Sequence, residues 1–269
     1  MKKRRKKDIR KKERNSEELM TFGGHLEVLR RMLFRIISVA GGVAIVVFCF
    51  KDITWQLLLA PGKYDFVTYR CIESLAHAIG FNDFRFTEYH VELIATELSS
   101  QFMTHITTAV YLGLLAASPY ILYELLRFVS PALHDNERRY SVQAATVIYV
   151  LFLLGVLMSY YVLFPVSFRF LGTYSVAEQV RSTITLDSYV STFTTLTLLM
   201  GIVFQMPVIA LTLGKMGVVT GDMLSHYRKH AFMLIMVVAA VITPPDIMTL
   251  VLVTIPMYML YEVSIWVIR

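Results

Sequence analysis

The loop Phe128–Arg139 contains the residue types best suited to bind a charged molecule. Pro131 fixes a turn within it, and Glu137 places a carboxylate shortly before a long apolar run. A partly desolvated carboxylate beside a membrane can hold a guanidinium group in a bidentate pair more strongly than a carboxylate in bulk water. Two alternatives stay open, because Glu137 could pair with Arg138 or Arg139, or could favour the N-terminus of the next helix.

Other polar groups lie within or at the ends of apolar runs, where they are costly and are therefore candidates for function. Gln205 lies in the middle of one run, and its amide could serve a function or make a helix-packing hydrogen bond. Glu124 and Arg127 are one helical turn apart, so we expect a local ion pair between them. Glu262, near the end of the last run, could extend toward water or hold another helix.

Known catalytic and cofactor-binding motifs are missing from the sequence. It has no HExxH, GxSxG, P-loop or glycine-rich dinucleotide motif, and its seven histidines are scattered singly. Its two cysteines, Cys49 and Cys71, cannot define a disulfide framework or a cysteine-based zinc site. We therefore expect no enzyme activity, no metal and no cofactor.

The composition indicates a membrane protein. Hydrophobic residues make up 56% of the 269 residues and charged residues only 17%, whereas soluble chains have about 45 to 50% apolar and about 25% charged residues. Mean hydropathy is +0.57. The net charge of +6 comes from a tail, because ten of the 26 basic residues lie in the first fourteen positions. The rest of the chain has 16 basic and 18 acidic residues, which argues against a nucleic-acid partner.

A helix needs about 20 mostly apolar residues to cross about 30 Å of hydrocarbon. We predict an all-α, polytopic membrane domain over residues 22–269, preceded by a basic, disordered tail at 1–21. Pro165 is expected to end the third span and Pro207 to interrupt the fourth. The six transmembrane helices are expected at about 32–50, 103–126, 141–164, 189–213, 227–242 and 247–268.

The last two spans are expected to be short and to be joined by the turn Thr243–Asp246. Two consecutive prolines in this turn remove two amide donors and disfavour helix in the residue before them. The apolar run at 231–242 rises only about 18 Å, which is less than the hydrocarbon thickness. The bilayer could thin there, the hairpin could lean on its neighbours, or the pair could be re-entrant and never cross.

The distribution of lysine and arginine orients the chain. With both termini in the cytoplasm, 20 basic residues lie on the cytoplasmic side and six on the other side. The external loop 51–100 is long enough to carry helical pieces that cap the outer face. The first apolar run is too long for the core of a cleaved signal, so we expect the tail to stay on the chain and to lie on anionic lipid.

Several short motifs occur in order along the chain, in addition to the loop Phe128–Arg139. They are His25-Leu26 with Leu29-Arg30, Ala60-Pro61, Phe164-Pro165, Phe204 with Pro207, Thr243-Pro244-Pro245-Asp246, and Ile255-Pro256 followed by Tyr261-Glu262. Together they resemble the motifs of TatC, the polytopic core subunit of the twin-arginine protein translocase, and the loop is close to that family's FxxPxLxxxERR pattern. The resemblance covers nearly all of residues 22–266.

The resemblance implies a receptor and scaffold in the bacterial cytoplasmic (inner) membrane. Such a protein binds twin-arginine signal peptides of folded precursors, recruits TatA/TatB-type single-span subunits, and uses the proton-motive force for export. It also implies a homo-oligomeric receptor complex without a cofactor.

The same resemblance assigns roles to individual residues. Signal-peptide binding would involve Glu137, Arg138, Arg139, Phe128, Pro131, Leu133, His25, Leu26, Glu27 and Arg30. Contacts with partner subunits would involve Gln205, Phe204, Pro207, Asp246, Met248 and Tyr258. Structural roles would fall to Pro61, Pro165, Pro244, Pro245 and Glu262.

Three positions depart from the family pattern. Val28 stands where an acid is usual and the acid is shifted to Glu27, which points about 100° away on a regular helix. Gln205 replaces a common glutamate and cannot ionise. Leu250 stands where a glutamine is common, which weakens any polar partner contact inferred there.

The alternative function is a six-span transporter of small solutes or ions. Gln205 and the threonine-rich fourth span could line its pore. Against it, the sequence has no ion pair in the middle of a span and no internal repeat.

Overall fold

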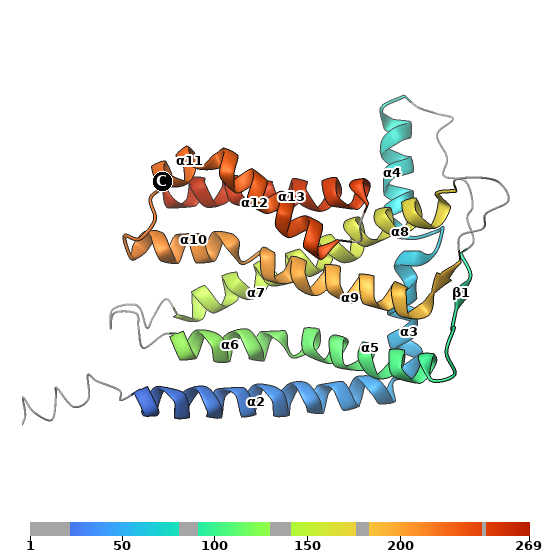
Figure 1. Ribbon diagram of the computed structural model, residues 1–269, viewed down its shortest axis with the longest axis horizontal. Helices are drawn as coiled ribbons and strands as arrows, with labels where there is room; N and C mark the ends of the chain where they lie inside the picture. The colour runs from blue at the N-terminus through green and yellow to red at the C-terminus, as the bar shows by residue number, and fades with distance from the viewer. Residues whose placement is uncertain (1–21, 81–90, 130–140, 176–182, 244–245) are drawn as a thin grey trace, which may run out of the picture.

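The computed structural model describes residues 22–80, 91–129, 141–175, 183–243 and 246–269, and the basic tail lies outside them. Long helices run side by side and form a bundle (Figure 1). In chain order they are α2 (Phe22–Cys49), α5 (Ser100–Ala116), α6 (Ser118–Val129), α7 (Ser141–Met158), α8 (Phe164–Thr173), α9 (Leu186–Val203), α10 (Met206–Lys215), α12 (Arg228–Ile242) and α13 (Ile247–Ile268).

Shorter elements lie toward the two ends of this bundle, except η4, which lies within it between α7 and α8. The start of α2 and the end of α13 share one end, which we call the N/C end, and α3 and α4 lie toward the opposite end, the cap end (Figure 1). The shorter elements are α3 (Lys51–Leu59), η1 (Ala60–Gly62), α4 (Val67–Ala78), β1 (Leu93–Ile94), η4 (Ser159–Leu163), β2 (Ile184–Thr185) and α11 (Gly221–His226).

The expected all-α class needs one small correction. β1 and β2 form a two-stranded parallel sheet of two residues each, with Leu93 opposite Ile184. The predicted external loop 51–100 does carry helical pieces, since α3 and α4 both lie within it. Secondary structure in this part of the chain is thus mostly helical, as the sequence predicts.

The first two predicted spans differ from the structure in their ends and in straightness. α2 begins at Phe22, ten residues before the predicted start at 32, because the polar segment before the apolar run is also helical. The second span is broken into α5 and α6, which bend by 57° at Ala117. Pro119 explains the break, since proline lacks an amide donor and its ring clashes with the preceding turn.

Pro165 does not end the third span, and that prediction is wrong. The helix continues from α7 through the π-helical turn η4 into α8, and ends at Thr173. Pro165 lies in the first turn of α8, directly after the π turn. A local π turn relieves the contact between a proline ring and the preceding carbonyl groups, so a helix can absorb a proline without ending.

The fourth span is interrupted close to Pro207, as predicted. α9 ends at Val203 and α10 begins at Met206, with Pro207 buried in the first turn of α10. α9 is the central helix of the bundle and contacts α5, α7, α8 and α12. Its hydroxyls bond a neighbouring helix and the backbone: the Thr197 hydroxyl lies 3.3 Å from that of Ser159 on η4, and Thr194 donates to the Val190 carbonyl at 2.7 Å.

Only one of the last two helices is short, which corrects the prediction that both are. α12 has 15 residues, whereas α13 has 22 and matches the predicted span 247–268. α12 ends at Ile242 and α13 begins at Ile247, with Pro244 and Pro245 outside the described residues.

Four of the described helical stretches are long and apolar enough to cross a membrane, or five if α5 and α6 form one bent span. The four are Leu26–Cys49, Ala145–Thr173, Leu186–Lys215 and Ile247–Ile268. α12 is shorter than these stretches. Six spans and a cytoplasmic location of both termini stay predictions.

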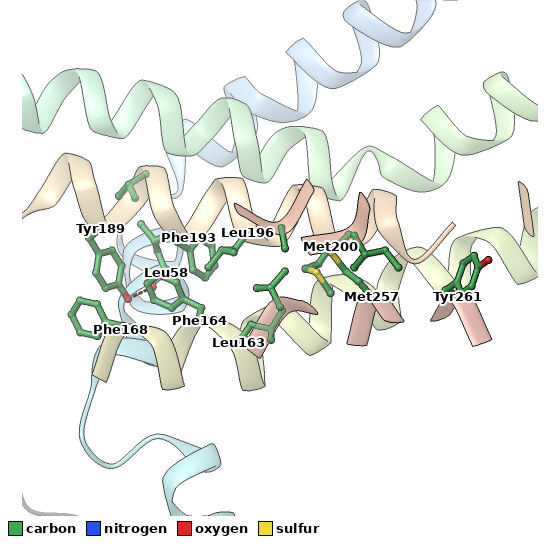
Figure 2. Packing of buried hydrophobic residues seen from close by; sticks show 14 of the residues in the cluster. Leu58, Leu163, Phe164, Phe168, Tyr189, Phe193, Leu196, Met200, Met257 and Tyr261 are labelled. Carbon is green, nitrogen blue, oxygen red and sulfur yellow. Dashed lines mark hydrogen bonds between the residues drawn. The ribbon is translucent and has the colours of Figure 1, made fainter. Parts of the chain in front are cut away.

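Aromatic side chains form the centre of the core near the cap end (Figure 2). The ring of Phe164 meets those of Tyr189 and Phe193 edge to face, with centroids 5.0 Å apart in each pair. The Tyr189 hydroxyl donates to the carbonyl of Leu58 at 2.9 Å, as the dashed line in Figure 2 shows. This bond ties α9 to α3, so the cap is fixed to the bundle by the core itself.

We predict that Gly155→Ala destabilises the contact between α7 and α9. A methyl group there would lie 2.5 Å from the Met200 carbonyl oxygen, which belongs to a helix backbone and cannot move aside. Overpacking of this kind costs about 1–3 kcal/mol. The measurement is thermal unfolding of the detergent-solubilised protein, in which the variant should melt at a lower temperature than the parent.

Gly41→Ala is the matched control for this prediction. A methyl group at Gly41 of α2 would meet no atom within 4 Å, so the exchange should gain helix propensity without a clash. Equal melting temperatures for Gly155→Ala and the parent protein would contradict the close contact of α7 with α9.

Candidate functional site

The first turns of α2 present an apolar stripe at the N/C end. Leu26, Leu33 and Ile37 are spaced to share one side of the helix and are exposed. Arg30 lies on the same side, with its guanidinium carbon 5.6 Å from the centroid of the Phe34 ring. These residues, together with Leu29, line a shallow hollow of about 390 Å³.

Glu27 lies beside this stripe and already has a partner. Its carboxylate accepts a hydrogen bond from Nε of Arg31 at 3.0 Å, one turn along the same helix. Both side chains are exposed, so this pair contributes at most about 1 kcal/mol to stability. The pair nevertheless neutralises the acid that stands next to the usual acidic position of the family, now occupied by Val28.

Glu124 on α6 forms an ion-pair cluster with two arginines. Nη1 of Arg35 on α2 lies 3.3 Å and 3.4 Å from its two carboxylate oxygens, and Nη1 of Arg127 lies 3.7 Å away. The Tyr120 hydroxyl donates to the same carboxylate at 3.3 Å. The Glu124 side chain is only 6% exposed. The predicted local pair with Arg127 is therefore present, but the closer contact joins α6 to α2.

Two more carboxylates at the N/C end are paired with arginines. Glu262 on α13 accepts a hydrogen bond from Arg228 on α12 at 2.9 Å and another from the Tyr258 hydroxyl at 3.0 Å. Of the two options left open for Glu262, the structure therefore has the one in which it holds another helix. Asp222 on α11 lies 3.6 Å from Arg269.

The central residues of the predicted signal-peptide surface lie outside the described residues. These are Pro131, Leu133, Glu137, Arg138 and Arg139. Phe128 lies in the last turn of α6, and the backbone of His25 lies in the first turn of α2. Since α6 packs against both α2 and α7, the loop begins at the end of a helix that contacts α2, which carries the apolar stripe.

The predicted partner-contact residues do not form one surface. Among them Met248 is exposed and Pro207 is buried. Gln205 donates its amide to the carbonyls of Ile148 on α7 at 3.1 Å and of Gly201 on α9 at 3.4 Å, which is the helix-packing role considered from the sequence.

The other partner-contact residues also have structural contacts. The Asp246 carboxylate accepts a hydrogen bond from the Thr249 amide at 2.6 Å and so caps α13. The Tyr258 ring meets Phe232 of α12 edge to face, with centroids 5.5 Å apart. Phe204 packs against the core cluster at the break between α9 and α10.

Two of the prolines assigned structural roles have defined surroundings. Pro61 is buried in η1, where the chain turns between α3 and α4. The Pro165 carbonyl accepts a hydrogen bond from the buried Tyr69 hydroxyl at 2.7 Å, which joins α4 to the third span.

Sequence reasoning missed the role of Arg35, which it counted only as a charge that orients the first span. Arg35 lies near the start of an apolar run, where an arginine needs either water or an acid. Glu124 is the acid near the end of the second apolar run, so the sequence did contain an indication of this pair. The pairing itself could not be read, because the two residues are 89 positions apart.

Within the described ranges, no group of three or more histidine, cysteine, aspartate or glutamate residues could hold a metal ion. Cys49 and Cys71 are both free and exposed. The arrangement at the N/C end is thus an apolar stripe bordered by ion pairs.

Comparisons with known proteins show the family of this chain. The family model for the Sec-independent protein translocase protein (TatC) matches residues 24–256. The TatC protein of Blattabacterium sp. subsp. Periplaneta americana is 32% identical over 257 residues, which are 94% of this chain and 97% of that protein. The TatCy protein of Bacillus subtilis is 38% identical over 173 residues, which are 64% of this chain and 68% of that protein.

Solved structures show the same fold. A crystal structure of the twin arginine translocase receptor TatC in DDM superposes with a TM-score of 0.74 at 29% identity, covering 91% of this chain and 99% of the other. A second crystal structure of a TatC receptor gives a TM-score of 0.71 and covers 97% of that chain. The chain therefore belongs to the TatC family of Sec-independent protein translocase proteins, multi-pass proteins of the bacterial inner membrane.

Proposed function

We propose that this protein is the receptor subunit of a twin-arginine translocase and binds signal peptides at its N/C end. The observation that best supports this proposal is that the described acidic side chains at this end already have partners. Each described carboxylate at this end, namely Glu27, Glu124, Asp222 and Glu262, is already paired with an arginine of the same chain. An incoming pair of arginines would have to displace one of these partners or find another acid.

Glu137 is the acid that we propose for this role. It belongs to the loop between α6 and α7, and α6 packs against α2, which carries the apolar stripe. A carboxylate near lipid headgroups offers two oxygens to the planar fork of a guanidinium, a geometry that lysine does not match. Arg138 and Arg139 compete for Glu137, so the signal arginines must bind it better than these neighbours do.

The apolar stripe is the proposed contact for the apolar segment of the signal. Leu26, Leu33 and Ile37 are exposed along two to three turns and lead from the end of the bundle toward its middle. Arg30 would lie at the entrance and favour acidic rather than basic residues next to the apolar segment. The signal would therefore bind along α2, with its arginines toward the loop.

Single-span partner subunits are proposed to bind around α12 and the break between α9 and α10. α12 buries only Ile235 and Ala239, and most of its other apolar side chains are exposed. An exposed apolar helix that is shorter than its neighbours leaves room for another helix beside it. Sequence reasoning missed these contact residues of α12, which include Met233, Leu234, Val237 and Val241.

The proposed topology has six spans with both termini in the cytoplasm, and the N/C end faces the cytoplasm. The excess of basic residues at that end supports it, as does the location of the start of α2 and the end of α13 at one end (Figure 1). Export would use the proton-motive force, but Gln205 cannot carry a proton, so the proton would act elsewhere in the complex. A homo-oligomer of this chain is proposed as the scaffold of that complex.

Glu137→Gln should lower the affinity for a twin-arginine peptide by at least about tenfold, because a buried charge-assisted pair contributes about 1.5–3 kcal/mol. Binding is measured by photo-crosslinking a peptide of the signal sequence to the protein in nanodiscs. The amide keeps the size of the side chain, so insertion and abundance should not change.

Asp222→Asn is the matched control. Asp222 lies at the same end, is exposed and is already paired with Arg269, so its loss should leave peptide crosslinking within about twofold of the parent, as expected for a surface pair. A peptide with paired lysines should label the loop much less than the twin-arginine peptide. Normal binding by Glu137→Gln, or equal labelling by both peptides, would contradict the proposal.

Gln205→Leu should weaken the association with a single-span partner while leaving peptide crosslinking unchanged. The exchange removes the hydrogen bond from Gln205, at the break between α9 and α10, to the carbonyl of Ile148 on α7, and so loosens the break that we propose the partner contacts. Such interhelical bonds contribute about 0.6–1.7 kcal/mol in membranes, which predicts a several-fold loss of co-purified partner. Ile209→Leu, at an exposed position of α10, is the control and should keep the complex intact.

A further inference from the structure

Helix α4, like α3 before it, differs from the long helices of the bundle in its direction (Figure 1). It extends across the long helices rather than along them, and it protrudes from the bundle near the cap end (Figure 1). If α7 and α8 cross the membrane, a helix in this direction lies along the membrane surface. Its height relative to the bilayer then decides whether it lies in water or in lipid.

The height of α4 is fixed by bonds to the third span. The Tyr69 hydroxyl donates to the Pro165 carbonyl at 2.7 Å, and the Thr68 hydroxyl donates to the Tyr161 carbonyl. This span begins at Ala145, 20 residues before Pro165. Twenty helical residues rise about 30 Å, which is the thickness of the hydrocarbon core. If Ala145 lies at one boundary of the hydrocarbon, the bond to Pro165 holds α4 at the opposite boundary, next to the headgroups.

Aromatic rings gather at the same level. The Phe66 ring, directly before α4, stacks on Tyr161 with centroids 5.7 Å apart, and it meets Tyr160 edge to face at the same distance. The guanidinium of Arg169 lies 5.1 Å from the centroid of the Tyr69 ring. Tyrosine and long basic side chains are enriched at membrane interfaces, where one end of the side chain is apolar and the other contacts water.

The exposed side of α4 is divided into an apolar and a polar part. Val67, Cys71, Leu75 and Ile79 follow one another at intervals of four residues and are all exposed, with Leu75 at 62% and Ile79 at 74%. We call these four residues the α4 stripe. Arg70 lies outside it and pairs with Asp65 at 3.4 Å. The buried Tyr69 fixes the rotation of the helix, so the stripe cannot turn inward.

We propose that α4 is an interfacial helix, and that the α4 stripe inserts into the lipid leaflet at the cap end of the bundle. The occupant of this face is lipid rather than water, because the helix lies at the level of the headgroups and carries contiguous large apolar side chains toward the outside. Lipid contact would hold the cap at a fixed height and oppose sliding of the third span through the bilayer. The proposal depends on the membrane location of the family and does not depend on peptide binding.

Cys71 allows a direct test without altering the stripe. In a Cys49→Ala background it is the only cysteine of the chain, and it can carry an environment-sensitive fluorophore. The protein is reconstituted into vesicles of phosphatidylcholine and phosphatidylglycerol. Quenching by a lipid with a nitroxide near the start of its acyl chain is compared with quenching by iodide in the water phase.

The matched control places the same fluorophore on the polar side of α4, in Cys49→Ala/Cys71→Ser/Arg70→Cys. Interfacial helices bury their apolar face roughly 5–10 Å below the headgroups, so we expect nitroxide lipid to quench the Cys71 probe at least about twofold more than the control probe. Iodide should show the opposite order. Blue-shifted emission should accompany the lipid quenching.

Three results would overturn the proposal. Equal quenching of both probes by the nitroxide lipid would place the stripe outside the bilayer. Stronger iodide quenching of the Cys71 probe would place it in water. Efficient disulfide formation between Cys71 residues of two copies, with no lipid quenching, would show that a second copy of the chain covers the stripe. Peptide crosslinking should be normal in the Cys49→Ala protein, so failure here is distinguishable from failure of the receptor function.

Discussion

No water is available in hydrocarbon to satisfy a polar group, and this constraint governs how the bundle holds together. Where helices bend or end, tyrosine hydroxyls donate hydrogen bonds to the carbonyl groups that the helix leaves free. Tyr189 and Tyr160 donate at 2.9 Å to the carbonyls of Leu58 and Leu57 in the last turn of α3, where the helix itself supplies too few donors. Tyr261 donates in the same way to Leu224 of α11 at 2.7 Å. Each bond joins two elements that are distant in sequence.

The same constraint explains the charge pattern at the N/C end. A carboxylate with 6% exposure, such as that of Glu124, would be costly without partners, and it receives Arg35, Arg127 and Tyr120. These contacts fix α6 against α2 at the place where the loop to α7 departs. Ion pairing thus stabilises this end of the bundle. Because the described acids there are paired with arginines of the same chain, fewer acids are available to a cationic ligand.

The two ends of the bundle are built differently. At the N/C end, helices are linked mainly by arginine and carboxylate pairs, while toward the cap end they are linked by aromatic packing and hydroxyl to carbonyl bonds. Arginine pairs can exchange partners with an incoming charged peptide at low cost, whereas buried aromatic contacts cannot. The arrangement therefore combines an exchangeable surface with a rigid cap.

The sequence by itself determined the helical membrane class, the family and the approximate position of each long helix, because apolar runs of span length and ordered motifs are local properties of the chain. It could not determine what each proline does. Pro119 bends a helix by 57°, Pro165 is absorbed by a π turn and Pro207 follows a break. The outcome depends on whether a neighbour satisfies the freed carbonyl, as Thr68 does for Tyr161, four residues before Pro165, and that is decided by packing.

Partnerships between distant residues were likewise decided only by the tertiary structure. Arg35 and Glu124 were both visible in the sequence as costly charges, yet their 89-residue separation hid the pair. The direction of α4 also follows from its contacts with the third span rather than from its own residues. Helix formation depends on hydrogen bonds between near neighbours, whereas ion pairs and helix orientation depend on which surfaces meet in space, and the order of residues alone does not specify this.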